Sequence, residues 1–154
     1  MKTAWGILPT LTLFAVSLSA DTVETVFFRA DLSPANQVPP VTGVSASGRA
    51  TIAAHVRRND AGEVVSGVVD FDVDYTIAGS VTVNGMHIHL GAAGVDGPIF
   101  IDSGIRSSNA VTAQGSGNIF RQVNVDSGAA LDALKGILVN PRSEERRVGK
   151  ECRL

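Results

Sequence analysis

The stretch VVDFDVDYTI, residues 68–77, restricts the fold of this chain more than any other feature, because its apolar and polar side chains alternate. An alternation with a period of two puts one set of side chains on each face of a β-strand, whereas a helix needs a period near 3.6. The apolar set is Val69, Phe71, Val73, Tyr75 and Ile77, and the polar set is Asp70, Asp72, Asp74 and Thr76. Because carboxylates along one strand repel each other, the polar face must be solvated or neutralised by a partner.

The same pattern recurs along the chain. Further strands are predicted in VFFRADL (26–32), ASGRATIAAHV (46–56), MHIHL (86–90), PIFID (98–102) and GNIFRQVNV (117–125). The side chains expected to face the core are Phe28, Ala30, Leu32, Ala50, Ile52, Ala54, Val56, Met86, Ile88 and Leu90. Asn59, Asp60 and Gly62 predict a turn. The spacing of these strands is typical of sandwiches and barrels.

One short helix is predicted in SGAALDALKGIL, residues 127–138. Ser127 would cap it, Asn140-Pro141 would end it, and its buried stripe would be Leu131, Leu134 and Leu138. We therefore expect one all-β domain, an immunoglobulin-like or Greek-key β-sandwich with one short helix near the C-terminus.

Both ends of the chain differ from this domain. Residues 1–20 carry Lys2, then an apolar run and small residues up to Ala20, which predicts a signal peptide cleaved after Ser19 or Ala20. At the other end, RSEERRVGKEC (142–152) is abruptly charged and, back-translated in frame, resembles a common sequencing adapter. We expect a domain over residues 21–141, with residues 142–154 as a non-native or disordered tail.

Charge and cysteine content exclude several classes of function. Without the tail and Lys2, the formal charge falls from −2 to −5, so the expected mature domain has no basic footprint for nucleic acid. The single cysteine, Cys152, lies in the tail, which argues against a disulfide framework or a cysteine metal site. Ser116 in QGSGN is superficially like a nucleophile elbow, but it lacks the strand-to-helix turn and a downstream histidine. We expect no catalytic residues.

Three segments in order resemble the chordin-type (CHRD) domain family. FRADLSPANQVPPV (28–41) resembles the family's opening strand and its L-S-G-x-N-E-V-P-P signature, with Pro34 and Gln37 in place of Gly and Glu. MHIHLGAAGVDGPIFI (86–101) resembles its H-I-H segment and Gly-rich loop, and SGAALDALKGILVNP (127–141) its short helix. The family continues with two more strands after this Asn-Pro, so the resemblance implies a truncated domain that lacks its closing hairpin.

His87 and His89 are the candidate metal ligands. Residues two apart on a strand share a face about 6.6 Å apart, and imidazole nitrogen binds Cu and Zn. The resemblance extends to the Cu/Zn superoxide dismutase sandwich, which the family has been compared with and which has a similar G-x-H-x-H strand. A catalytic metal usually needs a third protein ligand, and His55 could supply it only if its strand lay alongside. The alternative interpretation is that both rings, on the solvent side of their strand, hydrogen-bond loop carbonyls.

The aspartate stripe offers a second possible ion site. Carboxylate oxygens suit Ca²⁺, but the extended spacing of Asp70, Asp72 and Asp74 keeps them too far apart to share one ion. A solvated face is the preferred interpretation. Asp102 beside the Gly-rich loop could belong to a binding rim.

These observations predict an exported protein, secreted or periplasmic, that binds an unknown extracellular protein or surface ligand. We expect no cofactor, no nucleic-acid partner and no membrane span after signal cleavage. In chordin, the family's extracellular role is to antagonise growth-factor signalling. A single domain gives no reason to assign the growth-factor ligand of chordin to this chain. The alternative function is a copper- or zinc-binding redox domain that uses His87 and His89.

Overall fold

In the computed structural model of the protein, residues 21–90, 95 and 97–139 are described. The expected signal peptide and the charged tail lie outside them. The elements in chain order are β1 (Thr22–Leu32), η1 (Pro34–Asn36), β2 (Ser45–Arg58), β3 (Val64–Val83), β4 (His87–His89), β5 (Ile99–Asp102), η2 (Ser107–Asn109), β6 (Val111–Val125) and α1 (Gly128–Val139).

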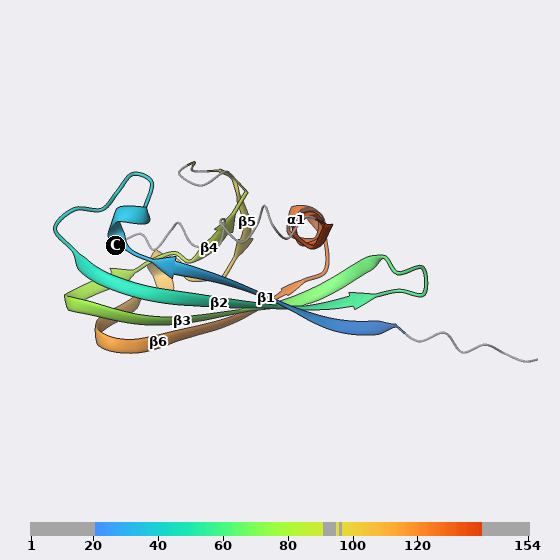
Figure 1. Ribbon diagram of the computed structural model, residues 1–154, viewed down its shortest axis with the longest axis horizontal. Helices are drawn as coiled ribbons and strands as arrows, with labels where there is room; N and C mark the ends of the chain where they lie inside the picture. The colour runs from blue at the N-terminus through green and yellow to red at the C-terminus, as the bar shows by residue number, and fades with distance from the viewer. Residues whose placement is uncertain (1–20, 91–94, 96, 140–154) are drawn as a thin grey trace, which may run out of the picture.

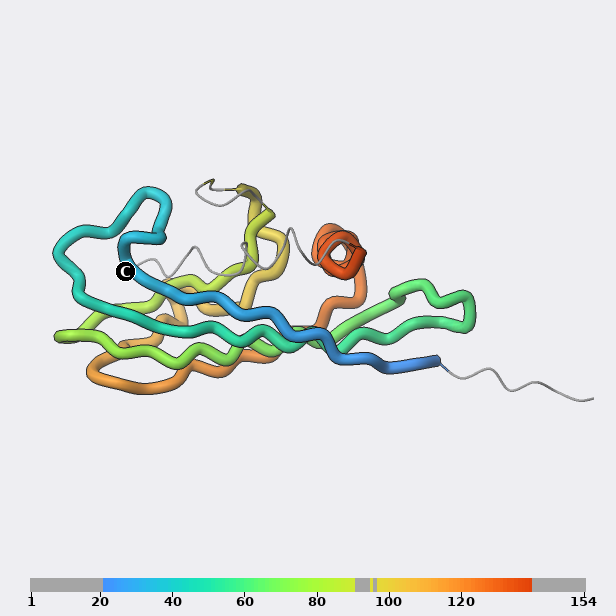
Figure 2. The backbone as a smooth tube through the Cα atoms, in the orientation of Figure 1, coloured from blue at the N-terminus to red at the C-terminus, as the bar shows by residue number. Residues whose placement is uncertain are grey.

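The strands form two antiparallel sheets. The first has the order β1-β2-β3-β6, and the second consists of β4 and β5. Figure 1 shows β4, β5 and α1 together over one face of the four-stranded sheet. The tube in Figure 2 shows the chain leaving this sheet after β3, crossing to the second layer and returning as β6 beside β3. The prediction of an all-β sandwich with one short C-terminal helix is confirmed.

The core lies between the two layers and follows the predicted alternation. On β2 and β3 the apolar set faces inward, and Val56, Val69 and Phe71 are almost completely buried. The second layer contributes Ile88, Ile101, Leu134 and Ile137 to the same cluster. Burial of large apolar side chains from both layers is the main source of stability for this fold. A chain with a single cysteine cannot form an internal disulfide.

Helix α1 packs on the sheet with a face that differs from the predicted stripe. Its buried side chains are Ala133, Leu134 and Ile137, while Leu131 and Leu138 are only partly buried. The sheet beneath has Gly67, where an added Cβ would lie 2.6 Å from Leu134 Cδ2. Leu134 belongs to both stripes, and the glycine beneath it allows its close approach to the sheet. The predicted cap, Ser127, donates its hydroxyl to the Asp126 carboxylate.

The turn between β2 and β3 forms where its residues predicted it. Asn59 Oδ1 accepts hydrogen bonds from the backbone N–H groups of Ala61 and Glu63. Gly62 adopts a φ of 78°, in the left-handed region that glycine enters without steric cost. This turn ends the long hairpin that projects at the right of Figure 1.

Two details of the strand predictions were wrong. Strand β6 begins at Val111 rather than Gly117, so its glycine- and serine-rich first half is also strand. Leu90, expected in the core, is 41% exposed. Its strand, β4, ends at His89, so the alternation that would have directed Leu90 inward stops one residue before it.

Candidate binding pocket and histidine pair

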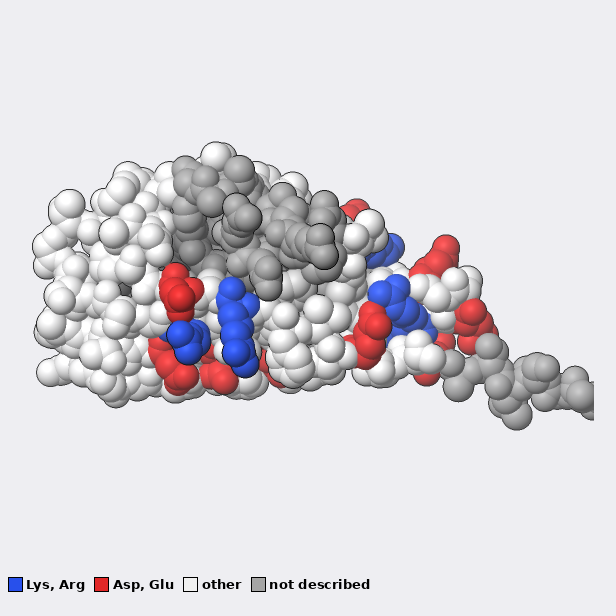
Figure 3. All heavy atoms as spheres, viewed as in Figure 1, with Lys and Arg blue, Asp and Glu red and all other residues white. Residues whose placement is uncertain are grey.

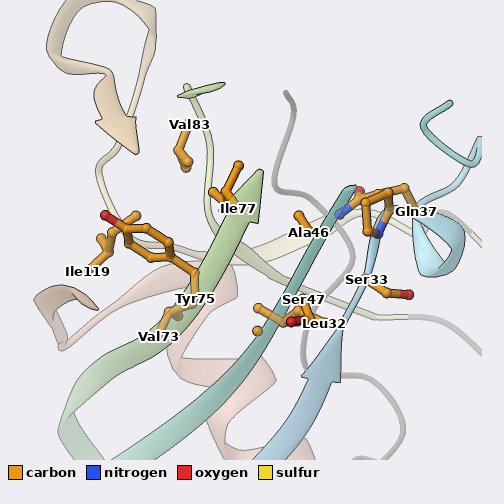
Figure 4. A pocket seen from close by; sticks show the side chains of 12 residues that line it. Leu32, Ser33, Gln37, Ala46, Ser47, Val73, Tyr75, Ile77, Val83 and Ile119 are labelled. Atoms are coloured by element: carbon orange, nitrogen blue, oxygen red, sulfur yellow. The ribbon is translucent and has the colours of Figure 1, made fainter. Parts of the chain in front are cut away.

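An apolar pocket lies on the inner face of the four-stranded sheet, at the end where β1 leads into η1. Figure 4 shows Val73, Tyr75 and Ile77 of β3 on one side of it and Leu32 and Gln37 on the other. Ala46, Val83 and Ile119 contribute further apolar surface. Four separate segments of the chain therefore build its walls.

A glycine opposite Tyr75 makes room for one of these walls. Gly117 on β6 is the direct partner of Tyr75 on β3. A Cβ at Gly117 would lie 2.5 Å from the Tyr75 hydroxyl oxygen, which is closer than real Cβ contacts. The aromatic ring thus lies over the bare glycine backbone and covers a glycine on an edge strand.

Polar side chains are few around this pocket, and they are neutral. Ser33 and Gln37 come from the η1 segment and Ser47 from β2. The hollow measures about 60 Å³. A space of this kind needs about 10–15 Å³ to hold one water molecule, and about 150 Å³ holds benzene. The pocket is therefore large enough for the tip of an aliphatic side chain and too small for a nucleotide or a flavin.

The two histidines of β4 lie close together in the second layer. Their ring centroids are 5.8 Å apart, and the ring planes are inclined by 77°. His89 is only 6% exposed, and the His87 side chain only 12%. The expectation that both rings lie on a solvent-exposed face was wrong. Strand β4 is three residues long, and Gly97 and Asp102 flank the rings on the side that was expected to be open.

A backbone carbonyl holds His89. Its Nδ1 lies 2.7 Å from the Gly97 carbonyl oxygen, and since a carbonyl can only accept, Nδ1 donates. In the neutral ring the lone pair then resides on Nε2. The alternative interpretation, in which the histidines bond loop carbonyls, is confirmed for His89.

Asp102 connects the second histidine to the next turn. It is the direct partner of His87 across β4 and β5, and its Oδ1 lies 3.7 Å from His87 Nε2. The same carboxylate accepts hydrogen bonds from the Gly104 N–H at 2.7 Å and from Arg106 Nη2 at 2.9 Å. Asp102 therefore serves as a junction between β5 and the turn that follows it.

A complete metal centre does not assemble from these residues. Within residues 21–90, 95 and 97–139, no group of three His, Cys, Asp or Glu side chains is placed to hold an ion. His55, the possible third ligand, lies in the four-stranded sheet and bonds other residues. The described residues therefore do not form a dismutase centre, which needs three or more protein ligands.

His55 belongs instead to a row of hydrogen bonds across the outer face of the sheet. Its Nδ1 lies 2.9 Å from Thr25 Oγ1 on β1, and its Nε2 lies 3.1 Å from Asp70 Oδ2 on β3. Gln122 of β6 donates to the other oxygen of Asp70. One hydrogen-bonded row thus crosses all four strands.

The rest of the aspartate stripe accepts hydrogen bonds from a neighbouring strand. The Asn118 amide donates to both Asp72 and Asp74, while Arg49 pairs with Asp31. Figure 3 shows acidic and basic side chains beside one another on the visible face rather than in separate fields of one sign. The shared amide donor lies between the two carboxylates and lessens their mutual repulsion.

Several of these features had no signal in the sequence. The pocket combines residues distant along the chain, and the bonds of Gln122 to Asp70 and of Thr25 to His55 depend on strand pairing that no local pattern reveals. One signal was available: the segment 28–41 that resembles the family signature supplies Leu32, Pro34 and Gln37 to the pocket. Ser116 lies within β6, and its hydroxyl bonds Thr76, so it is not at a strand-to-helix turn.

Comparisons with known proteins agree with this architecture. The family model described as the CHRD domain matches residues 28–143. No curated protein and no solved structure matches the chain. Among the residues that the structure describes, no helix is both long and apolar enough to cross a membrane. The match covers most of the chain and includes the pocket and the histidine pair, so the chain belongs to the CHRD-domain family.

Proposed function

We propose that this protein is an exported, non-enzymatic binding domain whose inner-face pocket receives an apolar group of an extracellular ligand. CHRD domains are generally extracellular binding domains. The observation that carries the proposal is the pocket itself, an apolar hollow with a few neutral polar side chains at its margin. Such a composition is typical of sites that recognise a ligand by shape and a few hydrogen bonds.

The dimensions of the pocket indicate the class of ligand. A hollow of about 60 Å³ takes a branched aliphatic tip such as that of leucine or valine. Ser33 and Ser47 offer hydroxyl groups that suit a neighbouring peptide backbone. We therefore infer that the ligand is a protein that presents an aliphatic side chain from an exposed segment.

The test uses one substitution on the two faces of one strand. Ala46 of β2 lines the pocket, whereas Ala53 of the same strand faces outward beside Asp70. Ala46→Leu fills the pocket, and Ala53→Leu is the matched control. Titration with N-acetyl-leucine amide, followed by amide chemical shifts, should move the signals of Ser47 and Tyr75 in the parent and in Ala53→Leu but not in Ala46→Leu. Equal responses in all three proteins, or none in the parent, would reject the site.

Export rests on residues 1–20, which lie outside the described residues. If the segment is a signal peptide, the protein recovered outside the cytoplasm begins at Ala20 or Asp21. Mass spectrometry of the intact exported protein measures this directly. An unprocessed N-terminus at Met1 would contradict cleavage.

Metal binding by His87 and His89 is the second candidate function. It is favoured by the bond from His89 Nδ1 to the Gly97 carbonyl, because metal-binding histidines commonly donate their other nitrogen to such a carbonyl. The described residues do not fit the metal centre of a copper- or zinc-dependent redox domain. The proposal is therefore limited to binding of Cu(II) or Zn(II) by two imidazoles.

A further inference from the structure

The two edges of the four-stranded sheet differ in how they are protected. No described strand pairs with the outer edge of β1, and its register with β2 is unbroken from Thr22 to Leu32. A straight edge of this length presents backbone N–H and C=O groups that can pair with another strand. Two large apolar side chains on this strand, Val23 and Phe27, are 71% and 65% exposed.

Strand β6, at the opposite edge, carries several features that oppose such pairing. The ladder between β3 and β6 shifts register between Ile77 and Ser80. Gly115 has a φ of 62°, and Arg121, a direct partner of the inward-facing Phe71, places a charge on the inner face at the edge. Bulges and inward charges are known means of preventing edge pairing. Strand β1 has no register shift in its described residues, and its inward-facing charge, Glu24, is paired with Arg58 of the neighbouring strand.

We propose that β1 pairs antiparallel with β1 of a second copy of this chain, with Thr25 on the two-fold axis. A two-fold axis perpendicular to the sheet keeps the inner faces of both copies on one side. Side chains that meet must then come from the same face, so an odd-numbered residue meets an odd-numbered one. This condition leaves only a few registers for residues 21–29.

The register centred on Thr25 brings complementary side chains together. Phe27 lies opposite Val23 of the second copy, and Arg29 lies opposite its Asp21. Favourable cross-strand pairs include an aromatic side chain with a β-branched one, two opposite charges, and two threonines. Centring on Phe27 would instead place Val23 against Asp31, and centring on Val26 would place Arg29 against Val23. Neither of these two registers pairs opposite charges.

The charges at this edge fit the same arrangement. Among the described side chains, no carboxylate is paired with Arg29. Of the two carboxylate oxygens of Asp21, Arg57 bonds Oδ2 and not Oδ1. Oδ1 of Asp21 is therefore placed to accept from Arg29 of the second copy. Pairing one short strand buries a small area, so the dimer lies at the weak end of protein interfaces and forms at high protein concentration.

Matched substitutions of the two exposed phenylalanines test the edge. Phe27 and Phe120 both lie on the outer face, on β1 and β6 respectively. Sedimentation equilibrium of the purified chain should show a reversible dimer, weakened about tenfold or more by Phe27→Lys, because symmetry removes the pair with Val23 twice. Phe120→Lys should leave the dissociation constant unchanged. A protein that stays monomeric, or equal effects of the two variants, would overturn the proposal.

A charge exchange tests the register independently. Arg29→Asp places two carboxylates opposite each other at both ends of the pair and should weaken the dimer about tenfold. The double variant Asp21→Arg, Arg29→Asp should restore most of the loss. Failure of the double variant to recover would show that these residues do not face each other.

A cysteine at the axis provides a covalent measurement. Residues directly opposite in an antiparallel pair have Cα atoms about 4.5–5.5 Å apart, which suits a disulfide. With Cys152→Ser in the background, Thr25→Cys should form an intermolecular disulfide in air. Asn124→Cys on β6 is the control that should remain monomeric. Equal cross-linking of both would contradict the proposal, and none of these results depends on the pocket.

Discussion

The two faces of the four-stranded sheet are made by the same strands but differ in polarity and in contact with solvent. The inner face carries Phe71, Ile52 and their neighbours in a core that excludes water, except at the pocket beside Tyr75. The outer face carries hydrogen-bonded rows such as Thr25, His55 and Asp70, which remain in contact with solvent. One alternating sequence thus produces a stabilising face and a soluble one.

The comparison shows where a binding site can form on such a domain. On the outer face, most polar side chains already satisfy each other, so little recognition chemistry is left there. On the inner face, the second layer of β4, β5 and α1 does not fill the end of the sheet near η1, and the pocket forms at that end. Incomplete coverage of the apolar face by the described elements is therefore the physical origin of the proposed ligand site.

The largest expected difference between the faces is in stability. Phe71→Ala removes an almost completely buried ring and should lower the free energy of unfolding by about 3–5 kcal/mol. Phe120→Ala removes a ring that is 51% exposed on the outer face and should change it by less than about 0.5 kcal/mol. Denaturation in urea, followed by circular dichroism, measures both. Similar losses in the two variants would mean that the faces are assigned wrongly.

Two glycines near the contact between sheet and helix should give smaller changes in stability, of opposite sign, when each is replaced by alanine. Gly67→Ala forces a Cβ against Leu134 Cδ2 and the His55 carbonyl oxygen, and should cost about 1–3 kcal/mol. Gly136 lies in α1 with no atom near its added Cβ, so Gly136→Ala should stabilise by about 0.5–1 kcal/mol through helix propensity. Thermal melting distinguishes these signs. A stabilising Gly67→Ala would show that α1 does not pack at this point.

On the outer face, removing the half-buried carboxylate of Asp70 should lower stability more than removing the exposed carboxylate of Asp72. Asp70→Ala removes the acceptor for both His55 and Gln122 and should cost about 1–2 kcal/mol. Asp72→Ala, whose carboxylate is exposed, should cost less than about 0.5 kcal/mol. A double-mutant cycle of Asp70→Ala with His55→Ala isolates the pair. A coupling energy of zero would show that the row is an incidental arrangement of surface side chains.

The histidine pair provides the test with the smallest expected effect. Isothermal titration with Cu(II) or Zn(II) should show weak binding that is lost in His87→Ala and retained in His55→Ala, because His55 bonds elsewhere. Equal binding by the parent and His87→Ala would remove the metal site. The stability of His87→Ala should be measured alongside, since its ring is largely buried.

Part of this structure follows from local sequence pattern, and part depends on pairing between distant segments. The alternation in residues 68–77 correctly separates the two faces of β3, because a period of two persists through a long strand. It misleads at His87, His89 and Leu90, since β4 has only three residues and its neighbours decide what is covered. The pocket needs β1, β2, β3 and β6 in register, and nothing in any one segment specifies that register.

Diffraction from crystals held under xenon shows most clearly whether the inner face is open and apolar beside η1. Xenon enters dry apolar hollows and avoids polar ones. A xenon atom should bind among Val73, Ile77 and Ile119 in the parent protein and should be absent in Ala46→Leu. Ordered water at that position, or side chains that close the hollow completely, would contradict it.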